Sequence, residues 1–171
     1  MKSLFDISGR TAVVIGGTSG LGRGIALGLA EAGANTIATG RRQDPDLAKS
    51  LGTIETTCDV ADRVSIEALR DKVLAEYKGV DILVNCAGRT FRKPTKDVAD
   101  EEWSGLLDTN VTGMLRACQT FYEPLKTSGR GRIVNIASLS SFVAFHEVAA
   151  YGASKAAVLA LTQSLGAEWA K

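Results

Sequence analysis

A tyrosine and a lysine lie four residues apart late in the chain, in the stretch AAYGASKAAV at 149–158. If this stretch is helical, Tyr151 and Lys155 lie on one face, one turn apart. Free tyrosine has a pKa of about 10, and a nearby ammonium group favours the phenolate and lowers that pKa. Such a pair can act as general acid in carbonyl reduction or as general base in alcohol oxidation.

Ser138 lies thirteen residues before Tyr151, at the end of the apolar run GRIVNIAS. We expect this run to be a strand, and ligands of open α/β sheets bind at the carboxyl ends of the strands. The Ser138 hydroxyl can hold a substrate oxygen there. Taken singly, Tyr151 reads as a packed aromatic residue and Lys155 as a solvated charge. Together with Ser138, catalysis is the better interpretation.

A second candidate site is the glycine-rich stretch VVIGGTSGLGRGIA, which places Gly16, Gly20 and Gly22 where an apolar run turns into a helix. Glycines in such a loop let the backbone approach a pyrophosphate at the amide-rich helix N-terminus. A tight turn is the ordinary alternative. Because the loop follows the first strand of a βαβ pattern, we favour a dinucleotide site.

The elements that must position these residues alternate between short apolar runs and longer helical stretches. Strands are expected at 11–16, 35–40, within 53–60, at 80–88 and at 131–138. Helices are expected at 21–33, at 63–77 with Asp62 as its N-cap, at about 100–125, and from about Tyr151 onward. This alternation predicts an α/β fold, a doubly wound parallel sheet with helices on both faces.

The composition is that of an ordinary globular protein, with 171 residues, 45% hydrophobic residues and a formal net charge of +1. This balance gives no electrostatic reason to expect nucleic acid or a membrane surface as a partner. Cys58, Cys86 and Cys118 are far apart and suggest neither a disulfide framework nor a metal site. We see no signal peptide or membrane-spanning run, so we expect a cytoplasmic location.

These motifs, in this order and at these intervals, resemble those of the short-chain dehydrogenase/reductases, nicotinamide-dependent enzymes on a Rossmann-type fold. Gly16-x-x-x-Gly20-x-Gly22 is similar to the cofactor loop of that family, with Ile15 where threonine is usual. NCAG at 85–88 is similar to the family's NNAG, with Cys86 replacing the second asparagine. The resemblance runs essentially from end to end and implies four catalytic residues: Asn110, Ser138, Tyr151 and Lys155.

The resemblance also implies the cofactor contacts. It places Asp59 near the adenine, at the end of the third strand. The full implied set is Gly16, Thr18, Ser19, Gly20, Leu21, Gly22, Arg41, Arg42, Asp59, Val60, Asn85, Ala87, Gly88, Tyr151 and Lys155.

Asn110 lies on the apolar face of its predicted helix, where a buried amide is costly unless it is hydrogen-bonded. One interpretation is bonding to neighbouring backbone. The family resemblance implies instead a proton relay from Lys155 to water, and we favour the relay.

The residues after the second strand bear on the choice of cofactor. No acidic residue is present at Thr39 or Gly40 to take the ribose hydroxyls, and Arg41 can meet a 2′-phosphate. We therefore expect NADP, with NAD possible and a solvated arginine pair as the alternative.

The substrate follows only from the resemblance. Stretches such as GIALGLAEAGA and NIASLSSF look most similar to a sugar-acid branch that includes gluconate 5-dehydrogenase and 2-deoxy-D-gluconate 3-dehydrogenase. Ser138 and Tyr151 are then the substrate-binding residues, and Arg92 is placed to meet a carboxylate. A 3-oxoacyl-[acyl-carrier-protein] reductase is the alternative.

The chain ends inside its last predicted helix, and only five strands are expected where a doubly wound sheet of this order has six. We therefore expect 1–171 to be a single NAD(P)-binding Rossmann domain that lacks its C-terminal strands. A fragment that binds dinucleotide without turnover is the alternative from another functional class. In a full-length form we expect a homodimer or homotetramer that acts on a small-molecule substrate.

Overall fold

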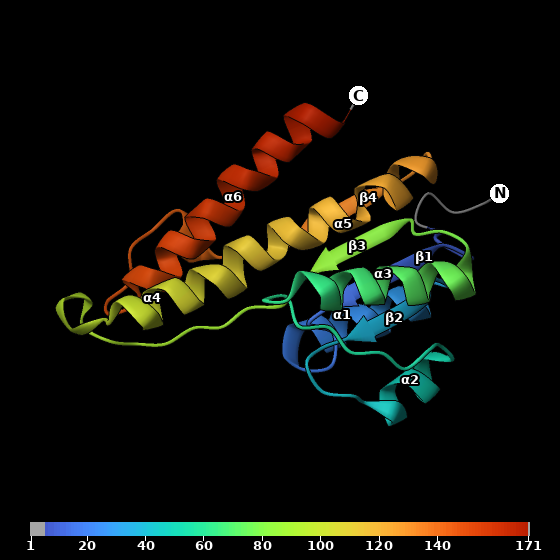
Figure 1. Ribbon diagram of the computed structural model, residues 1–171, viewed down its shortest axis with the longest axis horizontal. Helices are drawn as coiled ribbons and strands as arrows, with labels where there is room; N and C mark the ends of the chain where they lie inside the picture. The colour runs from blue at the N-terminus through green and yellow to red at the C-terminus, as the bar shows by residue number, and fades with distance from the viewer. Residues whose placement is uncertain (1–5, 171) are drawn as a thin grey trace.

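The structure is a computed structural model that describes residues 6–170, which form a parallel sheet with helices packed against it (Figure 1). The four strands of this range are β1 (Thr11–Ile15), β2 (Asn35–Thr39), β3 (Ile82–Asn85) and β4 (Arg132–Asn135). Across the sheet they follow the order β2-β1-β3-β4. Val13 lies opposite Ile37 of β2 and Leu83 of β3, and Leu83 lies opposite Ile133 of β4. The predicted doubly wound parallel fold is confirmed.

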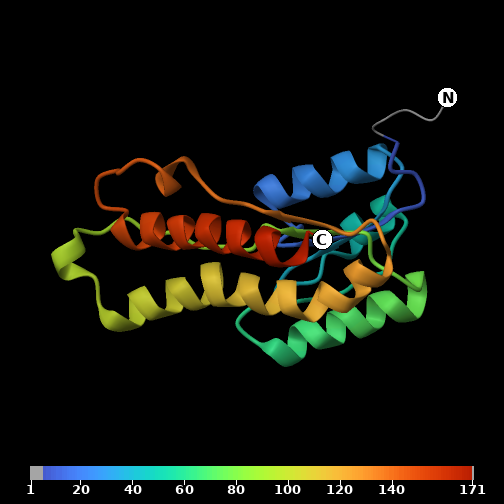
Figure 2. The same cartoon turned by 90° about the horizontal axis from the view of Figure 1, so that it is seen from above.

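β1 is buried on both faces because its side chains alternate between two cores. Val13 and Ile15 pack with α3 (Arg63–Tyr77) and α5 (Gly113–Thr127). Ala12 and Val14 pack on the opposite face, where α1 (Gly20–Glu31) lies. Figure 2 shows α1 on one side of the sheet and α3 and α5 on the other. The strand that leads into the glycine loop is thus held from every direction.

The other end of the sheet is less enclosed. β4 has β3 as its one sheet neighbour within the described residues, and Val134 is 46% exposed. Its second support is α6 (Ala149–Trp169), which packs beside α5 through Met114, Cys118 and Val158. None of the helices within residues 6–170 combines the length and apolar character that crossing a bilayer requires.

The strand expected within 53–60 is not formed, which corrects that prediction. In this part of the described chain the segment makes a single bridge, between Gly40 and Thr57. Threonine hydroxyls take part of the backbone bonding instead, since Thr53 Oγ1 donates to Thr36 O (2.9 Å) and Thr39 Oγ1 donates to Thr56 O (3.2 Å). The segment lies beside β2 without a regular ladder.

A short helix before this segment was not predicted. α2 (Pro45–Leu51) begins after Asp44, whose side chain accepts a hydrogen bond from Leu47 N (3.0 Å), and it ends at Gly52 with φ +65°. Aspartate as N-cap, proline at the first position and glycine at the end are strong helix boundaries. These signals were present in the sequence and were overlooked.

The helix expected at 100–125 is divided by one wide turn. α4 (Asp100–Leu107) is followed by a π-helical turn, η2 (Asp108–Thr112), and then by α5. π-turns inside helices often occur at functional sites. α5 begins at Gly113, where an added Cβ would lie only 2.8 Å from Val60 Cβ. The turn at Val60 therefore packs directly against the start of α5, which follows the π-helical turn that carries Asn110.

Asp81 joins the amino-terminal ends of the strands. Its Oδ2 accepts from Thr11 N (2.9 Å), and its Oδ1 accepts from Ser128 Oγ (2.9 Å) and Arg130 Nε (2.8 Å). Burial of this carboxyl opposes its charge, but the hydrogen bonds and the Arg130 charge outweigh burial and lower the pKa of Asp81. The carboxylate is therefore a fixed anion between β1 and β4.

Candidate active site

The backbone of the glycine loop is packed so tightly at two of its glycines that no side chain fits there. A Cβ on Gly16, whose φ is +86°, would overlap the backbone of Ala87, and a Cβ on Gly22 would overlap the Gly16 carbonyl oxygen. Gly20 also has a positive φ (+51°), but a Cβ there would meet nothing within 4 Å. The loop is thus closed against the residues after β3 and open at the start of α1.

The start of α1 fits a pyrophosphate. The N-cap Ser19 makes no side-chain cap hydrogen bond, and the first turn of α1 contains no acidic residue. Backbone N–H groups at such a start lack helical partners and favour an anion. Leu21 is exposed beside them, and Thr18 Oγ1 lies against Gly40 at the end of β2. The open loop and free amides are what a dinucleotide's phosphates require.

Arg41 and Arg42 follow β2 and are exposed, and neither takes part in an ion pair among the described residues. The nearby carboxylate of Asp44 is engaged by Arg23 Nη1 (2.9 Å). Its charge is therefore largely balanced, and both arginines are free to meet an anion.

Asp59 lies in the turn that precedes α3. Its Oδ1 accepts from Ala61 N (3.0 Å), while the residue as a whole is exposed. Val60 beside it is buried against Gly113. The predicted adenine contact thus lies in a turn that packs on α5.

Lys155 belongs to α6 and is buried. It is 7% exposed, and its Nζ donates to the carbonyl oxygen of Ile136 (2.6 Å). The same Nζ lies 5.8 Å from the centroid of the Tyr151 ring. Burial lowers the pKa of Lys155, and the neighbouring Cys86 thiol opposes that change. The predicted pair therefore lies one turn apart on α6, with its ammonium anchored to the end of β4.

Ser138 follows β4 and caps the short turn η3 (Leu139–Ser141). Its Oγ accepts hydrogen bonds from Ser140 N (3.2 Å) and from Ser140 Oγ (2.9 Å). Ser141 Oγ donates to the carbonyl oxygen of Lys155 (2.8 Å). The turn that carries Ser138 is thereby tied to the helix that carries Tyr151 and Lys155.

Asn110 lies in the π-helical turn and is 2% exposed. Its Oδ1 accepts from Arg89 N (2.8 Å), and its Nδ2 donates to Arg89 O (3.0 Å) and to Ser154 Oγ (3.0 Å). Ser154 Oγ in turn donates to Tyr151 O (2.7 Å). The amide therefore makes the backbone bonds of the alternative interpretation, and these bonds connect the loop after β3 to the first turn of α6.

Asn110 and Lys155 both lie next to Gly88. A Cβ on Gly88 would lie 3.3 Å from Asn110 Oδ1 and 3.9 Å from Lys155 Nζ. No hydrogen bond joins these two side chains within residues 6–170. The missing side chain of Gly88 leaves both polar groups facing one space.

The Asn85 amide is hydrogen-bonded to neighbouring elements, and the cofactor contact predicted for this residue stays a prediction. Its side chain is buried, and its Nδ2 donates to Asn135 Oδ1 (2.8 Å) and Cys118 Sγ (3.3 Å). Asn135 Nδ2 donates onward to Thr162 Oγ1 of α6 (3.0 Å). The structure uses the Asn85 amide to join β3, β4 and α6 beneath the site.

The polar residues that support the candidate catalytic side chains were not predicted from the sequence. Ser154 is visible in YGASK and Ser140 in SLSS, yet serines of this kind give no signal of their own. Their hydrogen-bond partners lie on other elements or depend on a tight turn. A rule that inspects every hydroxyl next to a candidate catalytic residue would have found both.

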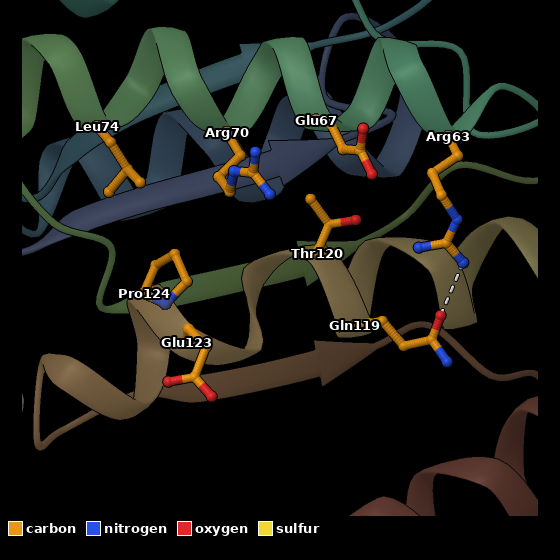
Figure 3. A pocket seen from close by; sticks show the side chains of 8 residues that line it. All are labelled: Arg63, Glu67, Arg70, Leu74, Gln119, Thr120, Glu123 and Pro124. Atoms are coloured by element: carbon orange, nitrogen blue, oxygen red, sulfur yellow. Dashed lines mark hydrogen bonds between the residues drawn. The ribbon is translucent and has the colours of Figure 1, made fainter.

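A surface groove of about 420 Å³ lies between α3 and α5, outside the candidate site (Figure 3). Arg63 from α3 donates to Gln119 of α5 (2.8 Å) across it, and the Thr120 hydroxyl in it is buried without a partner. The groove has two cationic and two anionic side chains in its lining and includes none of the predicted site residues. No cluster of metal-ligating side chains is formed within the described part of the chain either.

Comparison with known proteins places this geometry in context. A family profile described as short chain dehydrogenase matches residues 10–171. The chain is 38% identical over 176 residues to 2-dehydro-3-deoxy-D-gluconate 5-dehydrogenase of Bacillus subtilis, an alignment that covers 99% of this chain and 69% of that protein. It is 36% identical over 172 residues to D-threitol dehydrogenase of Mycolicibacterium smegmatis, covering 96% of this chain and 66% of that protein.

Solved structures agree with the sequence matches. A gluconate 5-dehydrogenase from Burkholderia cenocepacia, in complex with NADP and tartrate, superposes with a TM-score of 0.88 at 32% identity. That superposition covers 97% of this chain and 68% of the other. The chain spans between 55% and 74% of the length of curated relatives that it matches.

Proposed function

The chain belongs to the short-chain dehydrogenase family, and from that premise we propose that it transfers a hydride between a nicotinamide cofactor and an alcohol or carbonyl of a sugar acid. One observation carries the proposal. The buried Lys155 ammonium is anchored to Ile136 O at the end of β4, two residues before Ser138, and lies 5.8 Å from the Tyr151 ring centroid. The acid/base pair and the oxygen-binding hydroxyl therefore share one end of the sheet.

The chain's own residues supply the proton chemistry of this reaction. When bound, the nicotinamide supplies or accepts the hydride. The Lys155 ammonium lies one helical turn from Tyr151, and in the proposed reaction Tyr151 exchanges a proton with the substrate oxygen. Ser138 orients that oxygen. We propose that Asn110 and Lys155, which both face Gly88, pass the proton on to water.

The cofactor proposed is NADP, with NAD as the weaker ligand. Arg41 and Arg42 are exposed, and Asp44, the first carboxylate after them in the sequence, is engaged by Arg23. A relative of similar fold was solved with NADP. The three cysteines of the described chain are free, which supports a reducing compartment. Self-association is supported by the exposed apolar residues Leu139, Phe142, Val143 and Phe145. Size-exclusion chromatography tests whether the protein self-associates.

The substrate class is tested by a panel of gluconate, keto-gluconates and an acetoacetyl thioester, with turnover followed by nicotinamide absorbance. We expect turnover of a sugar acid, which agrees with the names of the relatives and with an exposed Arg92 that is able to meet a carboxylate. Turnover of the thioester alone would replace this proposal by an acyl-carrier-protein reductase.

A second candidate is dinucleotide binding without turnover. It is favoured by β4, the strand that leads to Ser138, whose Val134 is 46% exposed and whose only sheet neighbour in the described range is β3. An edge strand leaves a row of backbone N–H and C=O groups without a sheet partner. NADP binding seen by fluorescence, with no turnover of any panel member, would select this candidate.

A further inference from the structure

The oxygen of Ser138 has both of its acceptor positions filled from within its own turn. A serine hydroxyl has one proton to donate and two lone pairs that accept. Ser138 Oγ accepts from Ser140 N (3.2 Å) and also from Ser140 Oγ (2.9 Å). With both lone pairs engaged, the Ser138 hydroxyl has only its proton left to offer to a ligand.

We propose that Ser140 is a positioning residue that makes Ser138 a dedicated hydrogen-bond donor to the substrate oxygen. This inference rests on the proposed function. During carbonyl reduction the substrate oxygen gains negative charge and then a proton from Tyr151, so a neighbouring hydroxyl assists it by donating. In the reverse direction the same donor stabilises the oxygen as its proton leaves for Tyr151.

The turn around Ser140 is built so that each serine has a separate task. Ser141 Oγ accepts from Ser138 N (3.3 Å) and donates to Lys155 O (2.8 Å), which fixes the turn against α6. Ser140 makes its hydroxyl bond to Ser138 alone among the described residues. Without the Ser140 hydroxyl, Ser138 would keep one backbone donor and gain a free lone pair, so its proton would no longer have a fixed direction.

A double-mutant cycle tests whether Ser140 acts through Ser138. We expect Ser140→Ala to lower kcat about tenfold with KM nearly unchanged, the size of one lost hydrogen bond to a developing charge. Ser140→Thr, which keeps the hydroxyl, should restore kcat. In the Ser138→Ala background, Ser140→Ala should have no further effect. An equal further loss in that background would overturn the proposal. Ser164→Ala, on the exposed side of α6, is the control.

A second measurement needs no turnover. In Ser138→Cys the introduced sulfur takes the place of the Ser138 oxygen, and the two Ser140 donors should stabilise its thiolate and hold its pKa below the ordinary value of about 8.5. Adding Ser140→Ala should raise that pKa by about one unit. Burial raises the pKa of Cys58 to about 12 and of Cys118 to about 11, and also raises that of Cys86, so the native thiols titrate later.

The two measurements separate this inference from the proposed function. A thiol pKa that does not respond to Ser140→Ala would overturn the inference whatever the activity. A responsive thiol in a protein whose wild type turns over no substrate would refute the proposed reaction and support the placement of Ser140.

Discussion

The two regions that meet at the candidate site are held in different ways. The glycine loop between β1 and α1 is positioned by contacts that leave no room for a side chain, as at Gly16 and Gly22. The region formed by β4, η2 and α6 is positioned by hydrogen bonds from side chains, such as Lys155 Nζ to Ile136 O and Asn110 Nδ2 to Arg89 O.

This difference sets how each region responds to change. Backbone that touches backbone cannot yield without moving a strand, so an added methyl group in the loop has an abrupt effect. A hydrogen bond from a side chain can be removed, weakened or replaced one atom at a time. Substitutions in the glycine loop should therefore disrupt it as a unit, whereas substitutions in the region of β4, η2 and α6, which carries the candidate catalytic residues, should cause graded and separable losses.

The largest effect on turnover is expected from Tyr151→Phe. This substitution removes one oxygen from α6 and leaves the glycine loop intact. We expect kcat to fall roughly 10²–10⁴-fold, because the acid/base group is lost. The NADP dissociation constant, measured by fluorescence titration, should change little. Near-normal turnover in this variant would remove Tyr151 from the proposed mechanism.

Gly22→Ala should disrupt the glycine loop between β1 and α1. The new methyl group overlaps the Gly16 carbonyl oxygen, so we expect a loss of about 3 kcal/mol in the free energy of unfolding, together with weakened NADP binding. The matched control is Gly28→Ala, later in the same helix, where a Cβ meets nothing within 4 Å. That control should stabilise the protein by about 1 kcal/mol. Urea unfolding measures both, and equal behaviour of the two variants would contradict steric closure of the loop.

Asp81→Asn should weaken both regions together, since Asp81 joins β1 to the residues before β4. We expect a loss of about 2–3 kcal/mol at pH 7, because a buried acceptor of several hydrogen bonds is replaced. The folded pKa of Asp81 is lowered, so its stabilisation is present above about pH 4 and is lost as pH falls through the folded pKa. Urea unfolding at several pH values should show wild type and variant converging in acid. If the difference in the free energy of unfolding between wild type and variant stays constant with pH, the charge of the Asp81 carboxylate is not the source of the stabilisation.

Arg41→Ala should have the smallest effect, since this exposed side chain supports neither region. We expect NADP affinity to fall about tenfold and NAD affinity to stay unchanged, as for one lost charge-assisted contact. Competitive titration of both cofactors measures the ratio. An unchanged ratio would assign the 2′-phosphate to another residue.

The strong periodic signals in the sequence were sufficient for the fold, and tertiary hydrogen bonding accounts for what they missed. β1 is a continuous apolar run that becomes a doubly buried strand, and α3 begins and ends where its cap and stripe predicted. The strand predicted within 53–60 is not formed, and hydrogen bonds from threonine hydroxyls to backbone carbonyls take the place of part of a regular strand ladder. The π-helical turn at Asn110 was invisible because one wider turn barely alters the spacing of apolar residues.

The same limit applies to the site. The spacing of Tyr151 and Lys155 predicted their shared helical face, which the structure has. Sequence spacing does not reveal that Asn85 turns into the core, or that Ser140 donates to Ser138. Those pairings depend on which hydroxyl or amide is nearest after folding.

The closed contact between Gly22 and Gly16 also has a genetic consequence. Every single-base missense change in a glycine codon encodes a residue with a larger side chain, so no one-step substitution at position 22 can relieve this contact. In a library of random variants, position 22 should therefore tolerate almost no replacement. Ser140, which has threonine within one base, should offer a path by which function is retained while sequence drifts.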